Sequence, residues 1–448
     1  MTHHSDTPDR PASARLTTRG DMRRMARAAL VIVPLLLLAG CGGSDNPAIR
    51  LLNVSQDYTY LNIYVGGSTT TPNVAAVPTG TLSTYAGIST GSQALYFTEG
   101  SNTQSDALST ETESFASGEH RTYVAYGDTG EFAEYEIDEN QSAPAGGNAS
   151  VEVLNTAGDA GTPLDVYLTG SGATLSGASP NFSDLAAGTA TTFSSIASGT
   201  YELTVTATGN SSDVRLQVPS ITLDSGEVIT IIITESAGGY LVNAYLLPQQ
   251  GALTAELNPD ARVRAVAGVA SGSTVSAAIG STSLLSNAPA NSIGTYQLVP
   301  AASAAVSVTV DGVGVSSPGQ ALAAGEDYTL LVYQGPSGMQ ENWLIDTNRL
   351  PLGGAASVRL VDAMSGLTDP ISLYVNSVPV VTDVSLGDAS GYDTAVAATT
   401  TGAVSVTDTT TSQQLFSQSP VALSSQGVYT LFMFGSAASP NGVLNQDR

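Results

Sequence analysis

The chain has 448 residues and carries 39 acidic against 14 basic side chains, a formal net charge of −25. A surface this acidic repels nucleic acid and anionic lipid headgroups, so we predict that the protein binds no nucleic acid. Cys41 is the only cysteine, which excludes a disulfide within the chain.

The amino-terminal segment has the layout of a secretory signal peptide. Arginines at 23, 24 and 27 form a positive region, and residues 28–38 form an apolar stretch. This stretch is too short for a membrane-spanning helix, which needs about 20 residues. We therefore predict that residues 1–40 are a signal peptide. Because six basic and three acidic residues lie before Cys41, the mature chain has a formal charge of −28.

The end of this segment, Leu38-Ala39-Gly40-Cys41, resembles the lipobox of bacterial lipoproteins. The resemblance implies a lipid such as palmitate on Cys41, so that the chain attaches to the membrane through that lipid and residues 41–47 form a short tether. Position 42 is glycine. In Gram-negative lipoproteins an aspartate there usually means retention in the inner membrane, so the resemblance favours a cell-envelope protein anchored in the outer membrane, facing the periplasm or the surface.

After the tether, one pattern of two short apolar runs occurs four times, with the first run starting at Ile49, Val151, Val263 and Val358. The second run alternates with period two, as in LNIYV, LDVYL and ISLYV, which is typical of a half-buried strand. The first run carries a charge at its second position. These charged residues are Arg50, Glu152, Arg264 and Arg359.

Each copy continues with an aromatic residue, a further strand, a glycine turn and a long apolar strand. The aromatic residues are Tyr85, Phe193, Tyr296 and Tyr392. About seven or eight short strands in roughly 100 residues, with no helical period, predict an all-β fold of tandem immunoglobulin-like β-sandwich units. The predicted units are 48–140, 150–248, 261–350 and 356–448, separated by segments rich in proline, glycine and alanine.

Two features of the third unit support a sandwich. Leu322, Gly325 and Tyr328 form an LxxGxxY pattern that resembles the tyrosine corner of immunoglobulin-like domains. Trp343, the only tryptophan, falls in the last strand of the unit, and we expect it in the core or at its rim.

The repeat resembles the domain of unknown function 4397, which occurs in bacterial secreted proteins and lipoproteins. The copy that carries the resemblance best is 151–170, with Asn155 and Leu164-Asp165-Val166-Tyr167. A histidine that is usual in the family is replaced in each copy. The replacing residues are Asn53, Asn155, Ala267 and Asp362. The family brings no catalytic residues.

Signals of catalysis are sparse, and we predict that the protein is not an enzyme. His120 does not recur in the other copies, and residues 87–91 (GISTG), which hold Ser89, match G-x-S-x-G but precede a strand where a nucleophile elbow needs a helix. We predict no catalytic residue, no cofactor and no metal. Calcium is the alternative reading of the acidity. The acidic strand with Glu134, Glu136 and Asp138 is expected to be a solvated face, because a cation site would need ligands from a second loop.

Tyr64, Tyr167 and Tyr374 occupy one repeat position on the outward parity of the second run. They are predicted either as a contact strip for a glycan or protein, or as side chains covered by a neighbouring unit. These features predict a non-catalytic, lipid-anchored cell-envelope protein for adhesion, envelope organisation or partner binding. The alternative is a periplasmic or surface lipoprotein that binds a glycan or small ligand.

Overall fold

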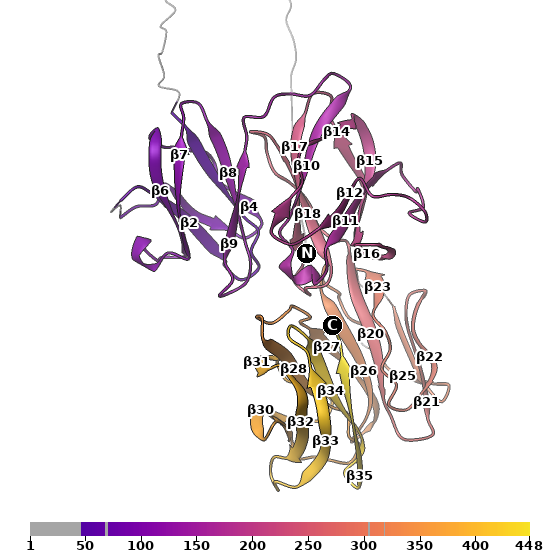
Figure 1. Cartoon of the computed structure of the whole chain (residues 1–448). Coiled ribbons are helices and arrows are strands. Elements are labelled where there is room, and N and C mark those ends of the chain that lie inside the picture. The colour runs from indigo at the N-terminus through magenta and orange to yellow at the C-terminus, as the bar shows by residue number, and fades with distance from the viewer. Residues whose placement is uncertain (1–45, 68–69, 303–304, 318) are drawn as a thin grey trace, which may run out of the picture. The chain divides into compact units, whose positions relative to one another are not determined.

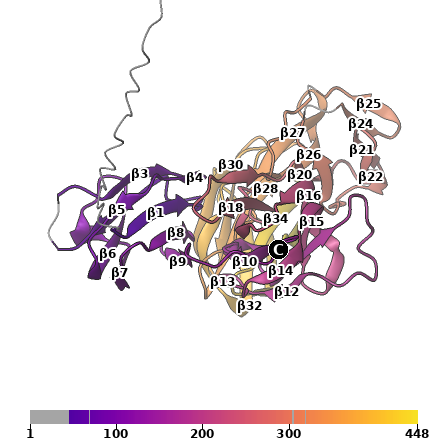
Figure 2. The same ribbon diagram turned by 90° about the horizontal axis from the view of Figure 1, so that it is seen from above.

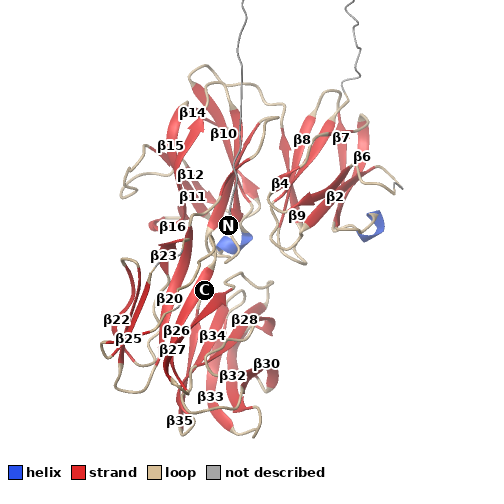
Figure 3. Ribbon diagram, turned by 180° about the vertical axis from the view of Figure 1, so that it is seen from behind, coloured by secondary structure: helices blue, strands red, loops and turns tan. Residues whose placement is uncertain are grey.

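The computed structural model describes residues 46–67, 70–302, 305–317 and 319–448. The predicted signal peptide and lipobox, Leu38 to Cys41, lie outside the described residues. Within them the elements are strands, apart from two single-turn 3₁₀ helices, η1 (Gln104–Asp106) and η2 (Gly158–Ala160) (Figure 3). The predicted all-β fold is therefore confirmed. No helix among the described residues has the length and apolar character needed to cross a membrane.

The first 90 or so described residues form two packed sheets, which can be followed in Figure 1. One sheet has the order β4-β1-β8-β9, with β5 also paired to β1, and the other has the order β3-β2-β6-β7. β1 and β8 are parallel, and the remaining pairs are antiparallel. The strands are β1 (Ala48–Asn53), β2 (Tyr60–Val65), β3 (Val74–Pro78), β4 (Thr81–Leu82), β5 (Ala86–Gly87), β6 (Gly91–Glu99), β7 (Ser109–Phe115), β8 (His120–Tyr126) and β9 (Ala133–Asp138).

The second pair of sheets repeats this plan, with the orders β13-β10-β17-β18-β19 and β12-β11-β15-β16. β14 pairs with β10, and β10 is parallel to β17. The strands are β10 (Asn148–Asn155), β11 (Leu164–Thr169), β12 (Phe182–Leu185), β13 (Thr189–Ala190), β14 (Ser194–Ala197), β15 (Gly199–Ala207), β16 (Asn210–Leu223), β17 (Val228–Glu235), β18 (Val242–Pro248) and β19 (Thr254–Glu256).

The third and fourth pairs follow the same order, and Figure 2 shows the strands from a second direction. The third pair is β23-β20-β26-β27 and β22-β21-β24-β25, and the fourth is β31-β28-β34-β35 and β30-β29-β32-β33. The strands of the third are β20 (Asp260–Gly268), β21 (Thr274–Ile279), β22 (Thr282–Pro289), β23 (Gln297–Pro300), β24 (Val306–Val310), β25 (Val313–Val315), β26 (Asp327–Gly335) and β27 (Gly338–Asp346). Those of the fourth are β28 (Ala355–Asp362), β29 (Ile371–Val375), β30 (Val378–Val384), β31 (Asp393–Ala397), β32 (Thr399–Asp408), β33 (Gln414–Leu423), β34 (Val428–Ser436) and β35 (Ser439–Gln446).

Each pair of sheets encloses its own apolar core. Two further buried clusters contain side chains from two successive pairs. One joins the first pair to the second, with Leu52, Val54, Val124, Ile137, Leu154, Ile232, Tyr245 and Leu247. The other joins the third to the fourth, with Val266, Leu331, Leu344, Val361, Ala363, Phe432 and Phe434. Residues 45–448 accordingly form one compact unit, and the division into four independent domains stays a prediction.

A β-bulge recurs in the second sheet of every pair, and a side chain of the adjacent strand holds it. At each bulge one non-glycine residue has a positive φ, between 44° and 61°. Its N–H donates to a polar side chain of the second apolar run. The four contacts are Ala76 N to Asn62 Oδ1 (2.7 Å), Asp184 N to Asp165 Oδ1 (2.9 Å), Asn287 N to Ser276 Oγ (2.9 Å) and Asp383 N to Ser372 Oγ (3.3 Å). The polar positions of the repeat therefore have a structural task, since a bulge leaves a backbone donor without a ladder partner.

The predicted tyrosine corner is present. The Tyr328 hydroxyl accepts a hydrogen bond from the Ala323 N–H at 3.0 Å. The fourth pair has the same contact, from the Ser424 N–H to the Tyr429 hydroxyl at 2.9 Å. Trp343 packs against the third core and lies edge-on to Tyr328, at 6.3 Å between ring centroids, as expected for a core or rim residue.

Candidate functional site

The most highly charged arrangement among the described residues gathers around Arg349, in the segment that follows β27. Asp57 follows β1, and Asp128 follows the parallel strand β8. Asp159 lies in η2, and Glu235 is the last residue of β17. In one sheet of each pair, two strands are parallel and end at the same edge: β1 and β8 in the first pair, β10 and β17 in the second. The residues at or after these ends therefore place the carboxylates close together.

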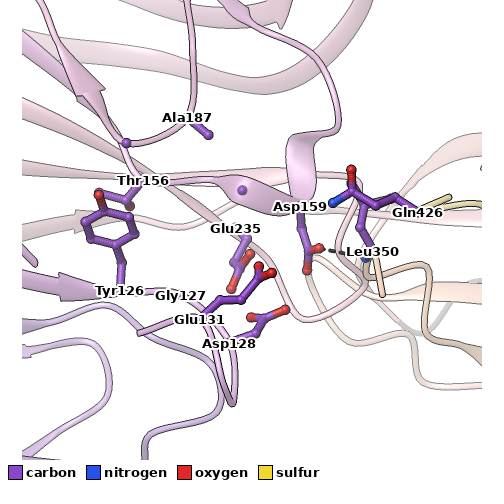
Figure 4. Close-up of a pocket in the computed structure, with 12 residues that line it drawn as sticks. Tyr126, Gly127, Asp128, Glu131, Thr156, Asp159, Ala187, Glu235, Leu350 and Gln426 are labelled. Carbon is purple, nitrogen blue, oxygen red and sulfur yellow. Dashed lines mark hydrogen bonds between the residues drawn. The ribbon is translucent and has the colours of Figure 1, made fainter. Parts of the chain in front are cut away.

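The Arg349 guanidinium contacts all four carboxylates. Its Nη1 lies 2.5 Å from Asp57 Oδ1 and its Nε lies 3.0 Å from Asp159 Oδ2. Nη2 pairs with Asp128 and lies 3.5 Å from Glu235 Oε1. The backbone strengthens the same attachment, because the Leu350 N–H donates to the other Asp159 oxygen at 2.7 Å, the dashed line in Figure 4. One arginine thus holds four loops.

The cluster has more negative charge than Arg349 can neutralise. Asp159 and Glu235 are each 4 % exposed. Burial and the neighbouring carboxylates Asp159 and Asp128 raise the pKa of Glu235 well above its ordinary value, and burial with Asp128 raises the pKa of Asp159. For Asp57, burial acts upward, but the Thr129 N–H and Arg349 outweigh it and lower the pKa. Asp159 and Glu235 are therefore repelled by neighbouring carboxylates, whereas the Thr129 N–H and Arg349 stabilise the charge of Asp57.

Three of these carboxylates could hold a metal ion. Oxygens of Asp128, Asp159 and Glu235 lie within 4.8 Å of one another. They line a cavity of about 230 Å³, into which Glu131 also points (Figure 4). Oxygen ligands of this kind suit calcium or magnesium. Arg349 already contacts all three of these carboxylates, so the described arrangement is an ion-paired junction.

A second set of buried charges joins neighbouring pairs of sheets. The side chains of Arg264 and Arg359 are 2 % and 1 % exposed. Arg264 Nη1 lies 2.5 Å from Asp447 Oδ1 of the fourth pair, and Arg359 Nη2 lies 2.5 Å from Asp346 Oδ1 of the third. The two pairs of sheets thus exchange ion pairs reciprocally, so that each contributes one arginine and one aspartate.

The repeated positions surrounding these arginines explain two patterns in the sequence. Each arginine donates to the threonine directly opposite it on the parallel strand, and each lies 4.6 Å from the centroid of the recurring tyrosine. The sets are Arg50, Thr122 and Tyr85; Arg264, Thr329 and Tyr296; and Arg359, Thr430 and Tyr392. The second copy has Glu152 at this position, where it accepts from the Thr230 hydroxyl at 3.1 Å. Sequence reasoning identified the charge and the aromatic residue but missed their acidic partners.

The sequence-predicted contact strip is wrong for two of its three tyrosines. Tyr64 and Tyr167 are 5 % and 3 % exposed, and Tyr374 is partly buried. The Tyr64 hydroxyl lies 3.4 Å from the Asn102 carbonyl of its own pair of sheets. Tyr64 and Tyr167 are covered, so they do not form part of an exposed surface strip, and for Tyr374 the contact role stays a prediction.

Among the described residues, His120 and Ser89 make no side-chain hydrogen bond to each other or to another reactive group. His120 starts β8, and its ring lies edge-on to Tyr85 at 5.0 Å between centroids. Ser89 lies between β5 and β6, so a strand follows it and the nucleophile-elbow geometry is missing. The acidic strand β9 is only partly a solvated face, because Glu134 accepts from the Ser109 hydroxyl at 2.7 Å and Glu136 from Arg121 at 3.1 Å.

Residues 47–167 match the family model described as Domain of unknown function (DUF4397). The resemblance predicted from the repeat is confirmed over this segment, which contains the first pair of sheets and the start of the second. No curated protein matches the chain.

Two solved structures show a low level of similarity to this chain. One is a family 41 carbohydrate-binding module that recognises α-glucan, from streptococcal virulence factors, at 5% identity and a TM-score of 0.16, covering 42% of this chain and 93% of that one. The other is a candidate cell adhesion protein from Bacteroides uniformis ATCC 8492, at 10% identity and a TM-score of 0.21, covering 46% of this chain and 99% of that one. At these scores neither likeness bears on function.

Proposed function

We propose that the protein is a non-catalytic, lipid-anchored cell-envelope protein whose role is adhesion, envelope organisation or partner binding. The observation that carries the proposal is that the arginines make contacts within the fold. Every arginine from residue 46 onward is engaged inside the fold: seven form ion pairs, and Arg448 donates to the carbonyls of Gly239 and Asn348. These arginines hold strands and loops of the described structure together.

This distribution of charged side chains also indicates which partners the surface can bind. The chain has no lysine, and its described arginines make contacts within the fold. Many carboxylates remain at the surface without a basic partner to balance them, so the surface is acidic. A partner with a basic or an uncharged surface fits such a protein, and an anionic partner is repelled. Attachment to the membrane then depends on the lipid on Cys41, since the acidic surface gives no attraction to anionic headgroups.

The anchor and the binding role can be tested on intact cells. Wild type should fractionate with the outer membrane and Cys41→Ser should not, because a single lipidated residue supplies the attachment. External protease should cleave wild type if the chain faces the surface and leave it intact if it faces the periplasm. A soluble wild type would refute the anchor, and turnover of a substrate that survives purification would refute the non-catalytic role.

Glycan binding is the second candidate, favoured by a groove of about 480 Å³ between β27 and the segment 382–391. The groove is lined by Trp343 and Ile345 together with polar groups such as Asn342 and Asp388, a mixture of apolar and hydrogen-bonding surface that sugars require. Binding on a glycan array that is lost in Asn342→Ala and kept in Arg121→Ala would support it. Absence of binding to any glycan would refute it.

A further inference from the structure

Asp362 stands at a repeat position where two other copies have asparagine. It ends β28, as Asn53 ends β1 and Asn155 ends β10. In all three, Oδ1 accepts the N–H of the residue two positions later, which fixes the side chain in the same orientation. The distances are 3.1 Å from Ser55 N, 2.9 Å from Ala157 N and 2.8 Å from Met364 N.

The second terminal atom distinguishes the acid from the amides. Asn155 Nδ2 donates to the Leu185 carbonyl at 2.9 Å, and Asn53 Nδ2 to the Val77 carbonyl at 3.2 Å. Asp362 is fully buried, and its Oδ2 has no hydrogen-bond partner among the described residues. The strand register identifies the carbonyl in the matching place as that of Val384, because Ile371 pairs with Val384 as Leu164 pairs with Leu185 and Leu61 with Val77. A carboxylate cannot donate to a carbonyl, whereas a carboxylic acid can.

The surroundings of Asp362 favour the neutral acid. No ion pair involves Asp362 in the described part of the chain, and the charged group that acts on it is Asp388. Tyr333, whose ring packs against Gly387, lies near Asp388 in turn. Burial, assisted by the charge of Asp388, raises the pKa of Asp362 to about 7, although the Met364 N–H acts in the opposite direction. The proton can therefore be gained or lost near neutral pH.

The same residue holds a segment that lines the groove beside Trp343. The Asp362 N–H donates to the Asp388 carbonyl at 3.1 Å, and the Gly387 N–H donates to the Asp362 carbonyl at 2.8 Å. Asn342 of β27 donates to the Gly387 carbonyl at 2.9 Å, which joins the segment 385–391 to the third pair of sheets. Repulsion between Asp362 and Asp388 would act directly on these contacts.

We infer that Asp362 is a proton-operated latch on the segment 385–391. As a carboxylic acid it donates to the Val384 carbonyl and holds the segment against β28. As a carboxylate it loses this hydrogen bond and repels Asp388, so the segment loosens and the groove opens. This inference does not rest on the proposed envelope or glycan-binding function.

The sign of the pH dependence follows from the proton balance. Unfolded aspartate loses its proton near pH 4, whereas folded Asp362 keeps it to about pH 7. Stability therefore falls as pH rises between these values and levels off above them. Acid tightens the latch, which is the reverse of the usual response of an ion-paired aspartate.

The test compares urea unfolding of wild type and Asp362→Asn between pH 4.5 and 8.5, with hydrogen exchange of residues 385–391 measured in parallel. Asp362→Asn should match wild type at pH 4.5 and unfold at higher urea at pH 8.5, because its amide donates at every pH. Exchange in 385–391 should accelerate with pH in wild type beyond the intrinsic rate increase, and not in the variant. An Asp362→Asn protein that is no more stable than wild type at pH 8.5 overturns the inference.

Asn155→Asp is the matched variant, since it places an acid at the same position of the second copy. It should gain a new loss of stability with rising pH, and Asn155→Asp that unfolds with the pH profile of wild type overturns the geometric argument. A direct carboxyl titration of Asp362 by NMR in the unmodified protein covers the case in which a variant fails to fold. A midpoint near 4 would refute the latch, and one near 7 supports it.

Discussion

Removing Arg359 should destabilise the protein strongly, because it breaks one of the two reciprocal ion pairs between the third and fourth pairs of sheets. Arg359 and Asp346 are 1 % and 0 % exposed, so Arg359→Met leaves a carboxylate in the interior without its main partner. Breaking a buried pair in this way costs about 3–5 kcal/mol. Asp346 keeps hydrogen bonds from Tyr296 at 2.6 Å and Thr329 at 2.5 Å, and Arg264 lies 3.8 Å away. We therefore expect the lower end, about 3 kcal/mol.

The assay is urea denaturation followed by tryptophan fluorescence, since Trp343 reports on the third pair of sheets. Arg121→Met is the control, because Arg121 pairs with Glu113, Glu119 and Glu136, which are 30–34 % exposed. Pairs of that kind contribute about 1 kcal/mol or less. The double variant Arg359→Met/Asp346→Asn should lose less than the sum of the single losses, by about 0.5–3 kcal/mol. A loss below about 1 kcal/mol for Arg359→Met, or strictly additive losses, would refute the assigned role of the pair.

Two further outcomes follow from the described contacts. Arg349→Met should free the segment after β27 and accelerate its proteolysis. Arg349→Lys should recover only part of the protection, because an ammonium cannot make the same set of directed contacts. Equal cleavage rates of wild type and both variants would contradict this. Asp165→Ala should cost about 2 kcal/mol or more, since it strips a charged acceptor from the Asp184 and Gly209 N–H groups. Burial acts to raise the pKa of Asp165, but the hydrogen bonds from those N–H groups outweigh burial, and the pKa is lowered. The difference in free energy of unfolding between wild type and Asp165→Asn should therefore disappear below about pH 4. A difference that is constant with pH would count against the assignment.

The repeat made much of the fold predictable. Period-two alternation in LNIYV placed Leu61 and Ile63 in a core, and both are fully buried. The LxxGxxY spacing predicted the Tyr328 contact because such a corner is local, spanning six residues. Alternation failed for Tyr64 and Tyr167, because parity tells which side of a sheet a residue takes and does not tell whether that side is covered.

The candidate site could not be predicted in the same way. Asp57 and Arg349 are 292 positions apart, and only the folded arrangement of loops brings them into contact. Likewise Asp346 of the third pair of sheets binds Arg359 of the fourth, and Asp447 of the fourth binds Arg264 of the third. A pattern within one copy of the repeat cannot reveal such contacts. The Asp362 substitution was visible in the sequence, but its meaning depended on knowing that Asn53 and Asn155 donate to a carbonyl.

The contrast between Arg349 and Asp362 indicates how this acidic chain manages its charge. Arginine is scarce, and the described arginines join separate elements, as Arg349 does by its contacts with four carboxylates. Asp362 has no arginine within reach in the described structure, and a buried carboxyl without a cation is stable chiefly as the neutral acid. The fold thus contains two kinds of junction. Those with arginine weaken in acid as their carboxylates are protonated, whereas the one at Asp362 weakens as pH rises towards 7. Acid therefore acts on the two kinds of junction in opposite directions, and the segment 385–391 is held most firmly when Asp362 is protonated.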